Sequence, residues 1–140
     1  MIVGFCGREH ALAWCFAKYL QVDCVFGAAG IAGSAMDRVV EYVPIASEDI
    51  EALAGFGGDN QIDLTIIGPE APLVKGIVDH FTAAGLACFG PSAAAAQLEG
   101  SKVFAKDFMA RHGIPTAAFG KFTDIDEAIA FIREHGAPIV

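Results

Sequence analysis

The sequence lacks any long hydrophobic run. Hydrophobic residues make up 54% of its 140 residues and the mean hydropathy is +0.49, which is too apolar for a disordered chain. Charges and glycines nevertheless interrupt every apolar stretch before the roughly 18 residues that a membrane span requires. The opening residues MIVGFCGREH have no cationic segment before their apolar stretch, unlike a secretory signal. We therefore expect a folded cytoplasmic protein with no membrane partner.

Basic residues are also few. Nine Lys and Arg stand against seventeen Asp and Glu, which gives a formal net charge of −8. A nucleic-acid-binding protein needs a basic patch to neutralise phosphates, so this charge argues against nucleic acid as a partner. A small anionic ligand needs only local donors and is compatible with it.

The sequence contains no CxxC pair, and no cysteine lies near a histidine at the spacing of zinc ligands. The histidines are likewise separated and show no metal or catalytic-triad pattern. We therefore expect no metal site in these residues, and reduced cysteines in the core or in loops. The four cysteines are Cys6, Cys15, Cys24 and Cys88, and the four histidines are His10, His80, His112 and His135.

Strand-like and helix-like segments alternate along the chain, which is typical of a parallel α/β sheet with flanking helices. Ser47 is expected to cap one helix, which Gly57 and Gly58 should end, and Thr123 to begin another. The segment 117–122 suits a strand or a loop. Strands are expected over 1–4, 22–26, 38–45, 63–68 and 86–89, and helices over 8–20, 50–56, 73–84, 92–98, 101–112 and 123–136.

The last residues, Ala137–Val140, resemble the opening of a buried strand. An unpaired apolar strand invites aggregation, and a domain seldom ends on one. We therefore expect this chain to be a fragment of a longer protein, although a natural short strand that ends there would give the same pattern.

Two glycine-containing loops follow expected strands. In GFCGREH, residues 4–10, glycines would let backbone N–H groups approach an anion, a helix N-terminus would add positive charge, and Arg8 could bind a phosphate or carboxylate. In AAGIAGSA, residues 28–35, small residues would let a ligand come close. No acidic residue ends the strand before this second loop, which argues against a bound dinucleotide. A plain turn explains either loop about equally well.

A third loop, GPEAPLV at residues 68–74, follows the most apolar strand. Open α/β sheets bind ligands at the carboxyl ends of their strands. Pro69 and Pro72 should stiffen the loop, so that Glu70 presents a fixed carboxylate suited to an amine or to ribose hydroxyls. A solvated loop acid is the alternative. Further on, Lys102 and Lys106 lie four residues apart on one helix face, where ordinary solvated lysines are the simpler explanation.

Together, GREHALAW at 7–14, DLTIIGPEAPLVKGIVD at 63–79 and FGPSAAAAQLEGSKVFAKDFMARHGIPTA at 89–117 resemble the amino-terminal part of the phosphoribosylamine–glycine ligase family, also called glycinamide ribonucleotide synthetases. The resemblance extends to the final GAPIV and covers essentially all 140 residues. The combination of these motifs in this order is specific, whereas no single one of them is.

The resemblance implies an ATP-grasp ligase of purine biosynthesis, which joins glycine to 5-phosphoribosylamine while ATP is cleaved to ADP and phosphate. The glycine carboxylate is first phosphorylated and the amine then attacks the acyl phosphate, while Mg²⁺ or Mn²⁺ neutralises the phosphates. The implied organisation is a Rossmann-like substrate-binding domain over residues 1–100 and the start of an ATP-grasp domain over 101–140. The expected partners are ATP, glycine and phosphoribosylamine.

The same resemblance implies which residues bind these molecules. No catalytic residue is expected in this segment. A second phosphate-binding lysine, a glycine-rich ATP loop and the metal ligands are expected beyond residue 140, so these 140 residues alone should be inactive. The implied substrate-binding residues are Gly7, Arg8, Glu9, Gly30, Gly33, Pro69 and Glu70, and Lys102 is the implied ATP contact.

The chain departs from the family pattern at two places. The usual GSGGREH reads GFCGREH here, so that Phe5 and Cys6 replace a Ser-Gly pair, and a side chain at Cys6 restricts the close backbone approach that glycine allows. Ile31 stands where an asparagine is expected and lacks its amide. Two other functions are also compatible with the residues: a stand-alone Rossmann-type small-ligand binding module and a nicotinamide-dependent oxidoreductase domain.

Overall fold

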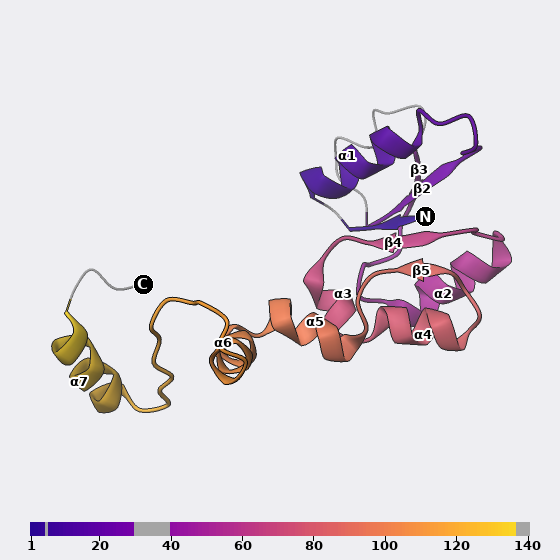
Figure 1. The fold of residues 1–140 in the computed structure, drawn as a ribbon. Helices are drawn as coiled ribbons and strands as arrows, with labels where there is room; N and C mark the ends of the chain where they lie inside the picture. Colours follow the sequence, from indigo (N-terminus) through magenta and orange to yellow (C-terminus); the bar gives the residue numbers. More distant parts are fainter. Residues whose placement is uncertain (5, 30–39, 137–140) are drawn as a thin grey trace. The chain divides into compact units, whose positions relative to one another are not determined.

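The computed structural model describes residues 1–4, 6–29 and 40–136 (Figure 1). The chain divides into two compact units, Met1–Gly100 and Ser101–Val140. The expected final strand, 137–140, lies outside the described residues, as do residues 30–39.

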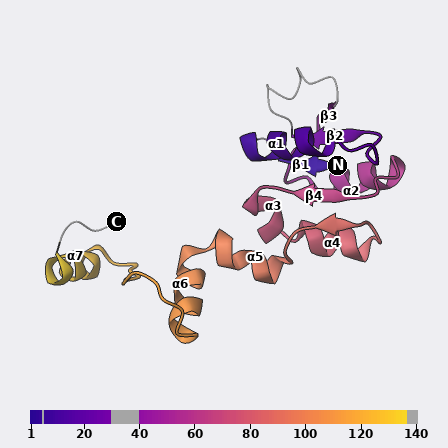
Figure 2. The same ribbon diagram turned by 45° about the horizontal axis from the view of Figure 1, so that its top comes forward.

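A five-stranded parallel sheet forms the centre of the first unit, in the order β3-β2-β1-β4-β5 (Figures 1 and 2). The central strand β1 pairs on one side with β2 and on the other with β4. The chain therefore builds one half of the sheet outward from β1 and then returns to build the other half. This order confirms the expected Rossmann-like parallel fold. The strands are β1 (Ile2–Val3), β2 (Val25–Ala28), β3 (Val40–Val43), β4 (Thr65–Ile67) and β5 (Cys88–Phe89).

Helices cover both faces of this sheet, because alternate strand residues point to opposite sides. Ile2 packs with Ala13 of α1 (Gly7–Phe16) on one face. On the other face, Val3 lies in the larger core cluster with Leu53 and Phe81. Those two residues belong to α2 (Ile50–Asp59) and α4 (Ile77–Ala83). The short helices α3 (Glu70–Val74) and α5 (Ala93–Gly100) complete the unit.

Three expected helix boundaries in the first unit are wrong. The helix α1 ends at Phe16, four residues early, because Leu20 is 99% exposed instead of facing the core. Asp49 caps α2 in place of Ser47, accepting a hydrogen bond from the Ala52 N–H at 3.2 Å. That helix also continues through Gly57 and Gly58, since Gly57 is buried against the side chains of Leu86 and Phe81 and tertiary packing overrides its low helix propensity.

The helix expected over 73–84 is two helices, α3 and α4. Gly76 lies between them with φ of +88°, a left-handed conformation that interrupts the helix. The first of the two starts at Glu70, so much of the expected GPEAPLV loop is helical.

The second unit contains the helices α6 (Lys102–Arg111) and α7 (Ile125–His135). Ser101 caps the first by accepting a hydrogen bond from the Phe104 N–H at 3.2 Å. Asp124, and not Thr123, caps the second. The segment 117–122 is neither strand nor helix. No residue of α6 or α7 is buried.

Candidate functional site

The candidate site lies where the strand order reverses, at the carboxyl ends of β1 and β4. In open α/β sheets this switch point is where ligands bind. Gly4 follows β1 and Gly68 follows β4, and the Gly68 N–H donates to the Val3 carbonyl at 3.0 Å. The loops that precede α1 and α3 are therefore neighbours in space, although more than 50 residues separate them in the sequence.

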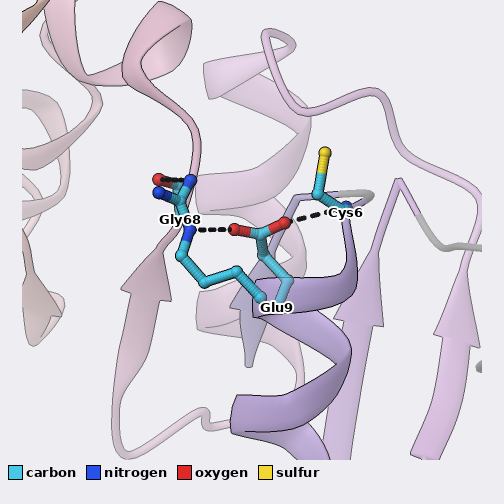
Figure 3. A network of polar contacts seen from close by, with 4 residues as sticks. Cys6, Glu9 and Gly68 are labelled. Atoms are coloured by element: carbon cyan, nitrogen blue, oxygen red, sulfur yellow. Dashed lines mark hydrogen bonds and ion pairs between the residues drawn. The ribbon is translucent and has the colours of Figure 1, made fainter.

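Arg8 connects these two loops through hydrogen bonds to Glu9 and Gly68, which are drawn as dashed lines in Figure 3. Its Nη2 donates to the Gly68 carbonyl oxygen at 2.5 Å, and its Nε donates to Glu9 Oε1 at 2.8 Å. The hydrogen bond to Glu9, the negative charge of Glu9 and then that of Glu70 raise the pKa of Arg8. The Arg8 side chain is nevertheless 62% exposed. The site therefore presents a permanent, fixed cation that can bind a phosphate or a carboxylate.

Glu9 lies beneath this arginine, with only 3% of its side chain exposed. Its second oxygen, Oε2, accepts a hydrogen bond from the Cys6 N–H at 2.8 Å. This bond belongs to a capping box, in which a glutamate at the third helical position bonds to the N-cap residue. The sequence signal for this bond is a glutamate three residues after the N-cap position, although cysteine is not one of the usual N-cap residues.

Glu70 and Pro69 form the other side of the site. Glu70 is exposed at the first position of α3, and Pro69 precedes it in an extended conformation with φ of −79°. Pro69 also lies against Gly4, since its Cδ would be 3.0 Å from a Cβ added there. The charge of Glu70 contributes to the raised pKa of Arg8, so an acidic and a basic side chain interact at this edge of the sheet. Such a pair suits a ligand that carries both an anionic group and an amine.

Gly7 is the first residue of α1 and is exposed. A Cβ added there would meet nothing within 4 Å, so the space above this helix N-terminus is open. Cys6 is exposed beside it and has an extended backbone, φ −105°, that any residue adopts. The other two substrate-binding candidates, Gly30 and Gly33, lie outside the described residues, as do the departures at Phe5 and Ile31.

The second unit contains the expected ATP contact. Lys102 is exposed at the first position of α6. Lys106, one turn later, donates to the Thr116 Oγ1 at 2.7 Å and to the Ala117 carbonyl at 3.1 Å. The two lysines therefore differ in role, because the ammonium group of Lys106 binds the segment that follows α6.

Other features of the described residues do not form part of this site. No group of three or more His, Cys, Asp or Glu side chains among them is placed to hold a metal ion, and no helix there is long and apolar enough to span a membrane. A cavity of about 330 Å³ lies at the opposite, amino edge of the sheet, lined by Met1, Asp23 and Asp63 among others. Because open α/β sheets bind ligands at the carboxyl edge, we place the site at Arg8 and Glu70.

The fold and the switch-point loops define a Rossmann-like domain whose carboxyl edge suits a small anionic ligand. Comparison with known families identifies it further. The model of the phosphoribosylglycinamide synthetase N domain matches residues 1–99, and that of the ATP-grasp (A) domain of the same synthetase matches residues 100–140. The chain belongs to the phosphoribosylglycinamide synthetase family, as its motifs predicted, and not to a family of nicotinamide-dependent oxidoreductases.

Curated relatives agree with this assignment. Proteins named phosphoribosylamine–glycine ligase are 59% identical to this chain in Vibrio cholerae, 59% in Allochromatium vinosum and 57% in Escherichia coli K12, each over all 140 residues. These alignments cover 33% of each relative. The chain thus spans about a third of the length of the curated relatives it matches.

Proposed function

We propose that this chain is the N-terminal part of an ATP-dependent ligase of de novo purine biosynthesis, which acts in the cytoplasm. The ligase joins glycine to 5-phosphoribosylamine to give glycinamide ribonucleotide, with release of ADP and phosphate. Family membership and the names of the relatives support the reaction. The observation that supports the role of this chain is the exposed Arg8, fixed at the switch point of the sheet with Glu70 beside it.

In this proposal, residues 1–100 bind and orient the phosphoribosylamine. Arg8 and the backbone N–H groups at the start of α1, that of Gly7 first, hold the phosphate, because a helix N-terminus and a guanidinium both favour a bound anion. Glu70 accepts hydrogen bonds from the amine or from the ribose hydroxyls, and Pro69 limits its freedom. Gly30 and Gly33 are proposed to contact the same ligand, as the family resemblance implies.

Residues 101–140 are proposed to begin the ATP-grasp domain, with Lys102 in contact with ATP. When bound, Mg²⁺ or Mn²⁺ neutralises the charge of the phosphates, and we place its ligands beyond residue 140. No residue of this segment is proposed to transfer a proton or form a covalent bond. The partners of the chain are the small substrates alone, with neither nucleic acid nor membrane.

A kinetic experiment tests this function. The Vibrio cholerae ligase is prepared with this chain in place of its matched third, and Glu70→Gln is introduced. A hydrogen bond to a charged group contributes about 1.5–3 kcal/mol, and about 1.4 kcal/mol is a factor of ten. We therefore expect the KM for phosphoribosylamine to rise roughly ten- to a hundred-fold, while the KM for ATP stays within about twofold of the unsubstituted chimera.

Two further variants complete the test. Lys102→Ala is expected to raise the KM for ATP and leave that for phosphoribosylamine unchanged. Glu51→Gln, the same chemical change at a side chain that is 85% exposed on α2, is the matched control and should alter neither. If Glu70→Gln raised the KM for ATP instead, the two sites would be misplaced. A folded chimera that binds glycinamide ribonucleotide without turnover would instead favour a stand-alone binding module.

A further inference from the structure

Glu9 is the most deeply buried charged side chain of the described residues, at 3% exposure. A buried carboxylate is costly unless hydrogen-bond donors compensate both of its oxygens. Here both oxygens have a donor at 2.8 Å, the Cys6 N–H on one and the Arg8 Nε on the other (Figure 3). The carboxylate is therefore part of a completed network and is not waiting for a ligand.

The strand ends are shaped around this side chain. A Cβ added at Gly4 would lie 2.5 Å from the Glu9 Cγ, and one added at Gly68 would lie 2.1 Å from its Oε1. Both distances are shorter than any real contact, so glycine is required at the ends of β1 and β4 to admit Glu9. The Glu9 side chain therefore lies close to the ends of both strands, and its carboxylate binds the Nε of Arg8.

Arg8 is consequently held at two points. Glu9 binds its Nε and the Gly68 carbonyl binds its Nη2. A flexible arginine loses side-chain entropy when it binds an anion, and holding it in place beforehand reduces that loss. Nothing else among the described residues is shown bonding to the Arg8 guanidinium.

We infer that Glu9 is a positioning residue, which acts on the phosphoribosyl substrate only through Arg8 by fixing the orientation of its guanidinium at the switch point. This inference rests on the proposed function. It refines the expectation that Glu9 binds the substrate, because the carboxylate orients the arginine that does so. Gly4 and Gly68 contribute to the same positioning of Arg8, since the absence of side chains there leaves the space in which Glu9 lies.

A double-mutant cycle in the chimeric ligase tests the inference. Gln at position 9 keeps the shape, but its NH₂ group must face one of two donors, so it cannot fix Arg8 as glutamate does. We expect Glu9→Gln to raise the KM for phosphoribosylamine about tenfold, and Arg8→Ala to raise it at least as much. The double variant should match Arg8→Ala within about threefold, because two residues that act as a unit do not contribute independently.

A second variant does not depend on how well Glu9→Gln folds. Gly68→Ala leaves the charge of Glu9 intact but displaces its carboxylate, so it should reproduce the rise in the KM for phosphoribosylamine. Gly58→Ala is the matched control, since a Cβ there meets nothing within 4 Å and the residue lies within α2. It should leave every KM unchanged, and thermal unfolding of each variant reports its folding.

The outcomes separate the inference from the proposed function. If Arg8→Ala leaves the KM for phosphoribosylamine unchanged, the proposed function fails. If Arg8→Ala raises it while Glu9→Gln and Gly68→Ala do not, or if the effects of Glu9→Gln and Arg8→Ala multiply in full, the inference alone fails. Equal rises in the KM for all three substrates would show that Glu9 only stabilises the fold.

Discussion

The residues at the switch point show what the glycines of a strand-to-helix loop accomplish. The sequence pattern suggested that glycines in GFCGREH make room for a ligand. In the structure, Gly4 makes room for Glu9, as does Gly68 at the end of the neighbouring strand, while Gly7 has open space around it. Only the last of these can admit a ligand directly. The arginine that we propose as the phosphate contact therefore depends on interior packing as well as on its exposed position.

The cysteines allow a prediction at the same scale. Burial raises the pKa of the Cys88 thiol to about 11, whereas Cys6 is exposed at the start of α1. Because the thiolate is the reactive form and Cys6 is exposed, iodoacetamide at pH 8 should modify Cys88 far more slowly than Cys6. Peptide mapping by mass spectrometry gives the two rates. In the urea-unfolded chain the two rates should converge; equal rates in the folded protein would contradict the prediction.

The same thiol gives the folded chain a defined dependence on alkaline pH. The ordinary pKa of this thiol is 9.0, and the folded state raises it to about 11. The folded state therefore holds the proton more tightly, and the stability this confers is complete below pH 9 and is lost as the pH rises toward 11. The free energy of unfolding is measured against pH for this chain and for Cys88→Ala. The difference between the two curves separates the contribution of Cys88 from the titration of lysines and tyrosines.

At the scale of elements, the sequence correctly predicted the strands and helices that are marked by the hydrophobic pattern of their own residues. The strand β4 lies within the expected 63–68, and α7 lies within the expected 123–136. The neighbourhood of Arg8 and Glu70 also followed from a general rule, since both come after parallel strands. The burial of Glu9 could not be read in the same way, because it depends on how closely Gly4 and Gly68 approach its side chain in the folded chain.

The wrong helix boundaries also have causes that lie outside the local sequence. The low helix propensity of glycine predicts that the helix ends at Gly57, but this residue is buried near Leu86 and Phe81 and remains helical. Gly76 lies in a segment of helical period, and its positive φ divides that segment in two. Whether a glycine ends a helix therefore depends on its tertiary packing and on its backbone conformation in the folded chain. Neither of these can be read from the neighbouring residues in the sequence.

This difference between glycines is testable. A Cβ at position 76 would make only ordinary contacts, the nearest at 3.6 Å, so Gly76→Ala should act through the backbone alone. A left-handed conformation costs an alanine about 1–2 kcal/mol, and we expect that loss in the free energy of unfolding. Gly58→Ala, within α2, should instead gain about 0.5–1 kcal/mol.

Urea denaturation of the 140-residue chain measures both changes. Gly76→Asn provides the internal check, because asparagine adopts the left-handed conformation more readily than alanine and should be less destabilising. If Gly76→Ala were neutral, the boundary between α3 and α4 would not depend on the left-handed residue.

At the scale of the whole molecule, the buried residues are unevenly distributed. The core residues of the described chain extend from Met1 to Ala96, whereas α6 and α7 contain none. The first unit therefore has its own hydrophobic core, and it carries the proposed phosphoribosyl site. The second unit matches the start of the synthetase's ATP-grasp domain and carries the proposed ATP contact.

This division of roles predicts that the 140-residue chain by itself binds glycinamide ribonucleotide but has no ligase activity. Transfer of a phosphoryl group requires preorganised charge around the phosphates and the metal, and we place those groups beyond residue 140. An assay of ADP release with glycine and phosphoribosylamine should therefore show only background turnover, while the chimeric ligase should be active. Turnover by the 140-residue chain that Glu70→Gln lowers would contradict the prediction, because a contaminating host ligase would not respond to that substitution.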